Sequence, residues 1–378
     1  MTEKIFHENT VFRRKINIED RPFAVIVRCA DTCNYACTYC YSQPEEIHGL
    51  MNSKTAVEVI KKVTNYCGTH RQIHFVWHGG EPLLCGIDFF KSIVAKCEEL
   101  SQFHIVNSIQ TNGYLLNQQF VDFCISNKIT ISTSMDGPEK VHNINRLDKN
   151  GIGTFFSTKQ AVELLRNNNI NPSCVTVFHR HSIPRLREIY EFFRDNQINF
   201  RVNPVVKIKG GANSYNDLAI SSIEYGESMC DLFDWWFQDD PKIRIEPFHT
   251  IIGNFIDDNV WGCDNHGQCL RSIISINPNG DIFPCGRFTS ESEFNLGNIN
   301  QCSSLEDVFS GELYSSLSSR DASTIDECKN CQFGPICNGG CMVTGYMARG
   351  EIFDKDYYCA GRRMLFHHIL SKVHQSVI

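Results

Sequence analysis

Residues 23 to 210 alternate between short apolar runs and longer stretches with helical periodicity, and this alternation constrains the fold more than any other feature. The apolar, β-branched runs predict strands, and the periodic stretches between them predict helices. Such alternation is typical of βα units that build a parallel sheet. The predicted strands are Ala24–Arg28, Ile73–Trp77, Ile105–Gln110, Thr130–Ser134, Cys174–Phe178 and Phe200–Val206, and the predicted helices are Lys54–Tyr66, Asp88–Leu100, Gln118–Ser126, Thr158–Asn167 and Pro184–Asp195.

Three cysteines follow the first predicted strand in the run CNYACTYCY. Cys33, Cys37 and Cys40 have the spacing C-x3-C-x2-C. Thiolates hold iron–sulfur clusters, and a cubane cluster takes one thiolate per iron. Three thiolates on one loop would leave the fourth iron open, and an open metal position is where chemistry occurs, whereas a closed shell of ligands is structural. The alternative interpretation is a chance cluster of cysteines or part of a zinc site.

With this triplet after its first strand, the chain resembles the radical S-adenosylmethionine (radical SAM) enzymes. The resemblance implies a 4Fe–4S cluster on the three cysteines, with SAM chelating the free iron. One electron would then split SAM into methionine and a 5′-deoxyadenosyl radical, which takes a hydrogen atom from the substrate. Tyr39, just before the last cysteine, fits the same pattern. The resemblance also implies an α/β fold, a partial (β/α)6 TIM-like barrel, whose site lies at the C-terminal ends of the strands.

Three further motifs follow predicted strands and resemble SAM-binding segments of this family. In HGGEPLL, Gly79 and Gly80 let the backbone approach a ligand closely, and Glu81 can accept hydrogen bonds from an ammonium group. Arg146, in SMDGPEKVHNINR, has donors that match the two oxygens of a carboxylate. Taken alone, each segment is also compatible with an ordinary turn, and Arg146 with a surface salt bridge. The resemblance implies that Gly79, Gly80 and Glu81 contact the amino group of SAM, that Ser134 contacts its ribose, and that Arg146 contacts its carboxylate. It also implies polar contacts from Gln110 and Asn112 of QTNG. Polar residues at strand ends serve as caps as well, which is the alternative for these two.

The chain changes in composition beyond Gly262, where short segments rich in glycine, proline and cysteine replace the βα pattern. Ile273–Ile276 and Ile282–Pro284 predict a hairpin around a turn at Asn277–Gly280. A segment of this kind is expected to bury little core and to need metal as a staple.

The cysteines of this region follow the seven-cysteine pattern of the SPASM extension, which is found in radical SAM enzymes that modify peptides and proteins. Cys263 adds an eighth thiolate, and eight thiolates suffice for two closed 4Fe–4S clusters. The alternative is a structural zinc site with four cysteine ligands. Resemblance to the anaerobic sulfatase-maturating enzymes implies one auxiliary cluster on Cys263, Cys269, Cys285 and Cys341, and a second on Cys328, Cys331, Cys337 and Cys359.

These patterns divide the chain into five parts. We expect an N-terminal extension at 1–22, a radical SAM core barrel at 23–215, a helical linker at 216–260, a SPASM domain at 261–360 and a C-terminal helix at 361–378. Within them, Ser221–Gln238 predicts a helix that packs on the barrel, and Arg362–Val377 predicts the terminal helix.

Composition and charge exclude several other classes. A net charge of −7 provides no global basic field for nucleic acid, and no run of ~18 apolar residues predicts a membrane span. Nineteen cysteines without a signal peptide favour a reducing, cytoplasmic location and metal rather than disulfides.

About twenty residues precede the first strand, too few for a leader-binding winged-helix domain. We expect a monomer that takes electrons from a flavodoxin- or ferredoxin-type donor.

The substrate is expected to be a ribosomally made precursor peptide or a protein. After hydrogen abstraction, closing a bond requires loss of one more electron, which an auxiliary cluster can accept. The sulfatase-maturating enzymes carry an Asp base directly after the cysteine that matches Cys285. In this chain the segment FPCGRF has Gly286 and Arg287 directly after Cys285, and neither residue accepts a proton at neutral pH as a carboxylate does.

The sequence therefore favours peptide crosslinking, through carbon–carbon (cyclophane) or thioether bonds, over the alternative of formylglycine-generating sulfatase maturation. A non-enzymatic zinc or iron–sulfur protein is favoured least, because it would not need the GGE segment, Arg146 or an open cluster. The modified residue, the bond formed and the general base are not specified by the sequence.

Overall fold

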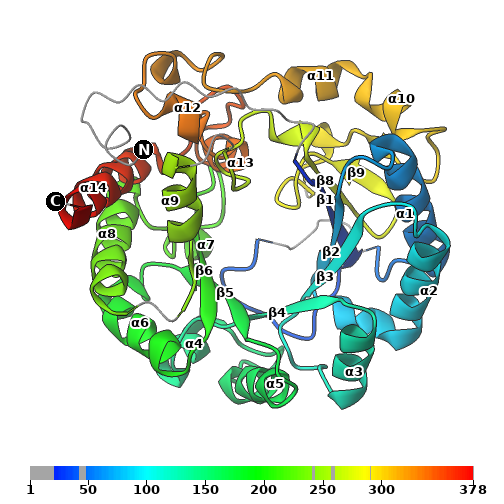
Figure 1. Ribbon diagram of the computed structural model, residues 1–378, viewed down its shortest axis with the longest axis horizontal. Helices are drawn as coiled ribbons and strands as arrows, with labels where there is room; N and C mark the ends of the chain where they lie inside the picture. The colour runs from blue at the N-terminus through cyan, green and yellow to red at the C-terminus, as the bar shows by residue number, and fades with distance from the viewer. Residues whose placement is uncertain (1–20, 42–47, 241–242, 257–259, 290, 378) are drawn as a thin grey trace.

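The computed structural model describes residues 21–41, 48–240, 243–256, 260–289 and 291–377. Of the predicted N-terminal extension, residues 1–20 lie outside the described residues. Parallel strands in chain order form a curved sheet, and each strand pairs with the next along the chain (Figure 1). These strands are β1 (Phe23–Ala30), β2 (Ile73–Gly79), β3 (Ile105–Gln110), β4 (Thr130–Ser134), β5 (Ser173–Phe178), β6 (Asn199–Pro204) and the short β7 (Ile245–Glu246).

Helices connect the strands and lie on the outside of the curved sheet (Figure 1). Amphipathic sequences explain this placement, since α1 buries Val59, Ile60 and Val63 and keeps its other face polar. The expected parallel α/β fold of partial TIM-like form is confirmed. The connecting helices are α1 (Ser53–Cys67), α2 (Gly86–Glu99), α3 (Gln118–Ser126), α4 (Glu139–Asn145), α5 (Phe155–Asn167) and α6 (Leu186–Asp195).

Two of the differences between the predicted elements and the structure have a plain physical reason. Helix α4 was not expected, because its two turns are too short to show a helical period in the sequence. Strand β6 ends at Pro204 rather than at Val206, since proline has no amide proton to donate to a neighbouring strand.

The hairpin beyond residue 262 extends the sheet of the barrel. Strand β8 (Ile273–Ile276) pairs in parallel with β1, and β9 (Asp281–Phe283) and β10 (Gly297–Asn298) follow in antiparallel order. The expectation that this region buries little core is wrong. Leu270, Ile274 and Phe288 are fully buried in the same core as the residues of β1, because the hairpin covers the free edge of β1 and continues its apolar face.

Helix α8 (Ser222–Gln238) lies against α14 (Cys359–Val377) at one side of the barrel (Figure 1). The two backbones approach closely, so that a Cβ on Gly361 would lie 2.0 Å from the carbonyl oxygen of Ser222. Helix α14 begins at Cys359, three residues before its predicted start. The remaining helices are α7 (Asn213–Asn216), α9 (Phe248–Ile256), α10 (Leu305–Phe309), α11 (Glu312–Ser318), α12 (Gly334–Cys337) and α13 (Met342–Arg349).

The C-terminal segments cross the open side of the curved sheet, from β8 and β9 to α14 (Figure 1). Three cysteines of the last third of the chain, Cys263, Cys285 and Cys341, thereby line a cavity together with His78 and Pro204 from the strands of the barrel. Across the described ranges, no helix has the length and apolar character that a bilayer span requires.

Candidate active site

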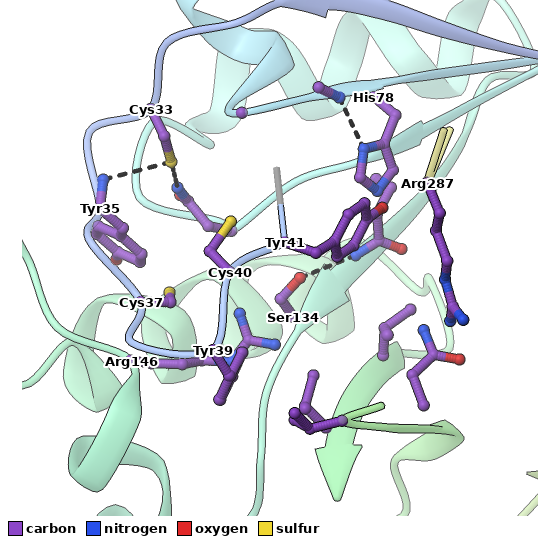
Figure 2. Close-up of a pocket in the computed structure, with 18 of the residues that line it drawn as sticks. Cys33, Tyr35, Cys37, Tyr39, Cys40, Tyr41, His78, Ser134, Arg146 and Arg287 are labelled. Atoms are coloured by element: carbon purple, nitrogen blue, oxygen red, sulfur yellow. Dashed lines mark hydrogen bonds between the residues drawn. The ribbon is translucent and has the colours of Figure 1, made fainter. Parts of the chain in front are cut away.

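A cavity of about 210 Å³ lies at the C-terminal ends of the parallel strands. Parallel strands end at one edge of the sheet, so segments that are far apart in sequence meet there. Figure 2 shows the cysteine loop on one side of this space, with Ser134 and Arg146 from other segments beside it. Of the predicted site residues, the cavity is lined by Cys33, Cys37, Cys40, Tyr39, Gly79, Gly80, Gln110, Asn112, Ser134 and Arg146.

The three cysteines lie close enough to influence one another. The Sγ of Cys33 accepts hydrogen bonds from the amide of Tyr35 at 3.3 Å and from Nδ2 of Asn112 at 3.6 Å. Burial above all raises the pKa of the Cys37 thiol to about 11, against the charge of Arg146 and with the charges of Cys40 and Cys33. A bound metal cluster would reverse this effect, because its positive charge favours the thiolates.

Gly79 and Gly80 allow the cysteine loop to pass directly over the end of β2. A Cβ on Gly79 would lie 2.2 Å from the carbonyl oxygen of Ala30, and one on Gly80 would lie 2.3 Å from that of Thr32. The amide of Gly80 donates to the Ala30 oxygen at 2.7 Å. The glycines therefore fix the loop that carries the triplet, in addition to lining the cavity.

Glu81 is fully buried and does not line the cavity. Its carboxylate accepts hydrogen bonds from the amide of Leu83 at 3.0 Å, the hydroxyl of Thr111 at 2.7 Å and the amide of Asn112 at 2.8 Å. Burial raises the pKa of Glu81 to about 7, although these three hydrogen bonds lower it. In the structure Glu81 ties the end of β2 to the end of β3, and a contact between its side chain and SAM stays a prediction.

Arg146 belongs to a buried charged group at the base of the cavity. Its Nε lies 3.0 Å from Oδ2 of Asp136, without the alignment of a hydrogen bond. The hydroxyl of Tyr39 also donates to Asp136, and the guanidinium carbon of Arg146 lies 5.5 Å from the centre of the Tyr39 ring. The surface-salt-bridge alternative for Arg146 is therefore wrong, since its side chain is 8% exposed.

Gln110 and Ser134 form a polar edge on the same cavity. The Nε2 of Gln110 donates to the hydroxyl of Ser134 at 3.1 Å and to the carbonyl of Thr133 at 3.0 Å. The two side chains come from the ends of β3 and β4, and together they offer a hydroxyl and an amide to a polar ligand.

A second cavity of about 260 Å³ adjoins the first. Three of the predicted auxiliary ligands, Cys263, Cys285 and Cys341, line it. The two cavities share one wall, which consists of Tyr41, His78, Asn203, Pro204 and Arg287.

The structure brings together the members of each predicted auxiliary quartet. Burial above all, and then the charges of Cys285, Cys341 and Cys263, raise the pKa of Cys269 to about 12. The pKa of Cys328 is likewise raised to about 12 by burial and then by the charges of its neighbours, which are Cys337, Cys359 and Cys331.

The spacing of these thiols bears on the zinc alternative. A zinc ion with bonds of ~2.3 Å draws its four sulfurs to within about 4 Å of one another. Among the described residues, no group of three or more His, Cys, Asp or Glu side chains is close enough to hold a single metal ion. A cubane places its thiolates further apart, since each binds a different iron.

Several residues of the site were not predicted from the sequence. Tyr41, His78 and Arg287 form the shared wall, and each lies within two positions of a predicted ligand or glycine, which is the only signal that would have identified them. Asp136 and His179 are fully buried around Tyr39, with the His179 and Tyr39 rings 5.7 Å apart. Nothing in their local sequence pattern indicates this position.

The chain matches two family models in the regions of the two cavities. Residues 27–193 match the radical SAM superfamily, and residues 263–332 match the SPASM iron–sulfur cluster-binding domain. The chain therefore belongs to the radical SAM enzymes with a C-terminal SPASM domain, as the sequence predicted. Enzymes of this class use SAM, a radical SAM iron–sulfur cluster and SPASM auxiliary clusters.

Within this class, the chain is similar to anaerobic sulfatase-maturating enzymes. It is 25% identical over 373 residues to the cysteine-type enzyme of Clostridium perfringens, covering 93% of this chain and 97% of the relative. It is 26% identical over 374 residues to the serine-type enzyme of Bacteroides thetaiotaomicron, with coverages of 92% and 90%.

Solved structures show the same fold. The structure of anSMEcpe with bound AdoMet superposes with a TM-score of 0.83 at 23% identity, covering 94% of this chain and 99% of that one. Streptococcus suis SuiB bound to its precursor peptide SuiA gives a TM-score of 0.65 at 18% identity, with coverages of 90% and 76%.

Proposed function

We propose that this enzyme oxidises a side chain of a peptide or protein, which binds at the wall between the two cavities. The observation that carries this proposal is the wall itself, where Tyr41, His78 and Arg287 border both the triplet cavity and the cavity of Cys263, Cys285 and Cys341. A side chain held there reaches both cofactor sites, one for hydrogen abstraction and one for removal of the second electron.

The chain offers ligands for three 4Fe–4S clusters, namely the triplet and the two quartets. When bound, SAM and these clusters supply a 5′-deoxyadenosyl radical and an acceptor for one electron. Arg146 suits the SAM carboxylate, because its guanidinium is buried at the cavity and held there by Asp136. Ser134, held by Gln110, suits the ribose.

His78 has a defined role at the shared wall. Its Nδ1 accepts a hydrogen bond from the amide of Gly79 at 2.7 Å, which leaves its proton on Nε2. Burial, and then the charge of Arg28, lowers the pKa of His78 to about 4, so the ring is neutral. His78 therefore presents a hydrogen-bond donor toward the substrate and orients it.

Similarity ranks formylglycine formation first among the candidate reactions, the reverse of the order that the sequence favours. The sulfatase-maturating relatives match over almost their whole length, whereas the similarity to SuiB is lower. We therefore propose oxidation of a Cys or Ser in a sulfatase-type segment as the first candidate.

Peptide crosslinking is the second candidate, and the chemistry of the second cavity favours it. Gly286 and Arg287 lie in this cavity, where neither supplies a carboxylate base. Of the described carboxylates there, the pKa of Asp264 is lowered to about 2, against the effect of burial, by the charge of Arg362 above all. Such a carboxylate is a poor proton acceptor.

The two candidates are distinguished by product analysis. The enzyme, SAM and a reductant are incubated with a sulfatase peptide that carries Cys or Ser, and in parallel with a peptide encoded beside the gene. An aldehyde on the first peptide, trapped by a hydrazine, supports formylglycine formation. A product of the second peptide lighter by about two hydrogens, without an aldehyde, supports crosslinking. Production of 5′-deoxyadenosine with neither peptide changed contradicts both candidates.

A further inference from the structure

Arginines outnumber carboxylates on the walls of the second cavity, although the chain as a whole carries a net charge of −7. Such a contrast matters because a charge away from bulk water is costly unless it is paired. The charged side chains that line the cavity are Arg28, Arg201, Arg287, Arg362, Asp264 and Asp356.

Both carboxylates of this cavity already have partners. Asp264 is paired with Arg362 through a direct hydrogen bond. Asp356 accepts hydrogen bonds from the amides of Cys341 at 3.0 Å and Tyr358 at 2.8 Å and from the hydroxyl of Thr344 at 2.7 Å. Arg362 also lies within ion-pair range of Asp356, with its Nε 3.9 Å from Oδ2, so both carboxylates are engaged by the same guanidinium.

Arg28 is also satisfied by neighbouring groups. Its Nη1 donates to Oδ1 of Asn277 at 3.2 Å and to the hydroxyl of Thr289, and its Nη2 lies 3.4 Å from Asp31. Among the described residues, Arg201 and Arg287 are therefore the arginines of this cavity without a carboxylate within ion-pair distance.

Arg201 and Arg287 differ in what they face. The Nη2 of Arg201 lies 3.9 Å from the Sγ of Cys263, so this guanidinium is turned toward the auxiliary quartet. Arg287 borders both cavities, and its guanidinium carbon lies 6.0 Å from the centre of the Tyr41 ring. Figure 2 shows the Arg287 side chain reaching into the space beside Tyr41. Within the described ranges, Arg287 has neither a hydrogen-bond acceptor nor an ion-pair partner.

We infer that Arg287 binds a carboxylate of the substrate, at the shared wall and next to the side chain that reacts. A guanidinium matches a carboxylate with two parallel hydrogen bonds, and the partly enclosed wall strengthens that pair. The substrate would then carry an Asp or Glu beside the modified position, or end in a free carboxylate there. This inference rests on the proposed function and specifies its substrate class.

The test is a binding measurement that does not depend on turnover. Anaerobically reconstituted enzyme with SAM is dialysed to equilibrium against radiolabelled acetyl-Gly-Asp-Gly-amide or its Asn counterpart. We expect the Asp peptide to bind at least about tenfold more tightly than the Asn peptide. A third probe, acetyl-Gly-Asn-Gly with a free carboxyl terminus, shows whether a terminal carboxylate serves as well as a side chain.

Variants of Arg287 connect the preference to this residue. Arg287→Gln should reduce the Asp-to-Asn preference to below about twofold, and Arg287→Lys should retain part of it, because the charge remains without the planar fork. The matched control is Arg166→Gln on the outer helix α5, where Arg166 is exposed and should leave the preference unchanged.

Two results would overturn the inference. One is equal binding of the Asp peptide and both Asn probes by the wild-type enzyme. The other is an Arg287→Gln variant that keeps the preference while shifting the midpoint potential of an auxiliary cluster, which would assign Arg287 to the cluster. The formation of peptide product is measured in a separate assay. If the enzyme shows no preference for the carboxylate but still forms product, the inference fails and the proposed function stands. Carboxylate preference without product from any peptide contradicts the proposed function alone.

Discussion

The Nε of Arg146 lies 3.0 Å from Oδ2 of Asp136, and the two side chains are 8% and 0% exposed. A buried pair of this kind holds the guanidinium in one orientation, since moving either charge away from the other is costly. The hydroxyl of Tyr39 and the amide of Val177 donate hydrogen bonds to Asp136, so these two bonds and the charge of Arg146 hold the carboxylate in place.

The first prediction concerns SAM affinity. Arg146→Lys keeps the charge but loses the planar fork, so SAM should bind more weakly by ~1–3 kcal/mol. Asp136→Asn should weaken SAM binding as well, because it leaves the guanidinium unpaired. Equilibrium dialysis with labelled SAM measures both, with Arg166→Lys as the control. Unchanged affinity in Arg146→Lys would assign Arg146 a structural role only.

The second prediction separates initiation from completion. Replacing Cys33, Cys37 and Cys40 with Ala should abolish reductive SAM cleavage, because no open iron remains to bind SAM. Replacing Cys328 or Cys331 should leave some cleavage and abolish peptide product. Chromatography of 5′-deoxyadenosine and mass spectrometry of the peptide provide the two readouts. Wild-type cleavage by the triple variant would contradict the assignment of the triplet. Circular dichroism controls for misfolding, since cluster binding and folding are coupled.

The third prediction concerns metal content. Eleven assigned cysteines with SAM should hold three cubanes, and thus about twelve irons per chain after anaerobic reconstitution. Iron, sulfide and zinc assays on one sample decide this. A sample with zinc and only about four irons would contradict both auxiliary clusters and leave the triplet cluster in place.

The fourth prediction concerns Glu81 as a structural residue. Glu81→Ala leaves the amides of Leu83 and Asn112 buried without acceptors, which should lower the free energy of unfolding by ~2–5 kcal/mol. The control is Glu163→Ala on the surface of α5, which should change it by less than ~0.5 kcal/mol. Thermal unfolding of the two variants under argon provides the comparison. Equal melting temperatures would show that the Glu81 contacts contribute little.

The fifth prediction is a dependence of stability on pH. Burial lowers the pKa of His142 to about 3, and both His142 and His179 are fully buried. A histidine whose pKa is lowered by folding contributes stability above its unfolded pKa of ~6.5, and this contribution is lost as the pH falls toward the folded pKa. Acidification from about pH 7 to about pH 5 should therefore cost up to ~2 kcal/mol at His142.

The variant His142→Gln isolates this contribution. The raised pKa of Glu81 acts in the opposite sense, because its contribution is present below the unfolded pKa and is lost as the pH rises through about 7. Comparing wild type with His142→Gln cancels the Glu81 contribution, and the variant should lose less stability on acidification. Parallel unfolding curves at both pH values would contradict the assignment.

The sequence alone predicted the βα order, the strands to within a few residues, and the motifs that line the cavity. Local patterns carry this information, because strand and helix periods are properties of neighbouring residues. Cys33 follows β1, and Gly79, Gln110 and Ser134 are the last residues of β2, β3 and β4, and parallel strands all end at the same edge. Their convergence on one cavity therefore follows from sequence order.

The tertiary structure decided how the C-terminal region joins the barrel. β8 pairs with β1, from which it is separated by more than 240 residues, and this contact places Cys285 and Arg287 across from His78. The structure also shows the carboxylate of Glu81 joining two strand ends, while its contact with SAM stays a prediction. Long-range pairing and the partners of a buried charge depend on which groups the fold brings together. No local pattern records them, and so the shared wall and the unmatched charge of Arg287 emerge only when the chain is folded.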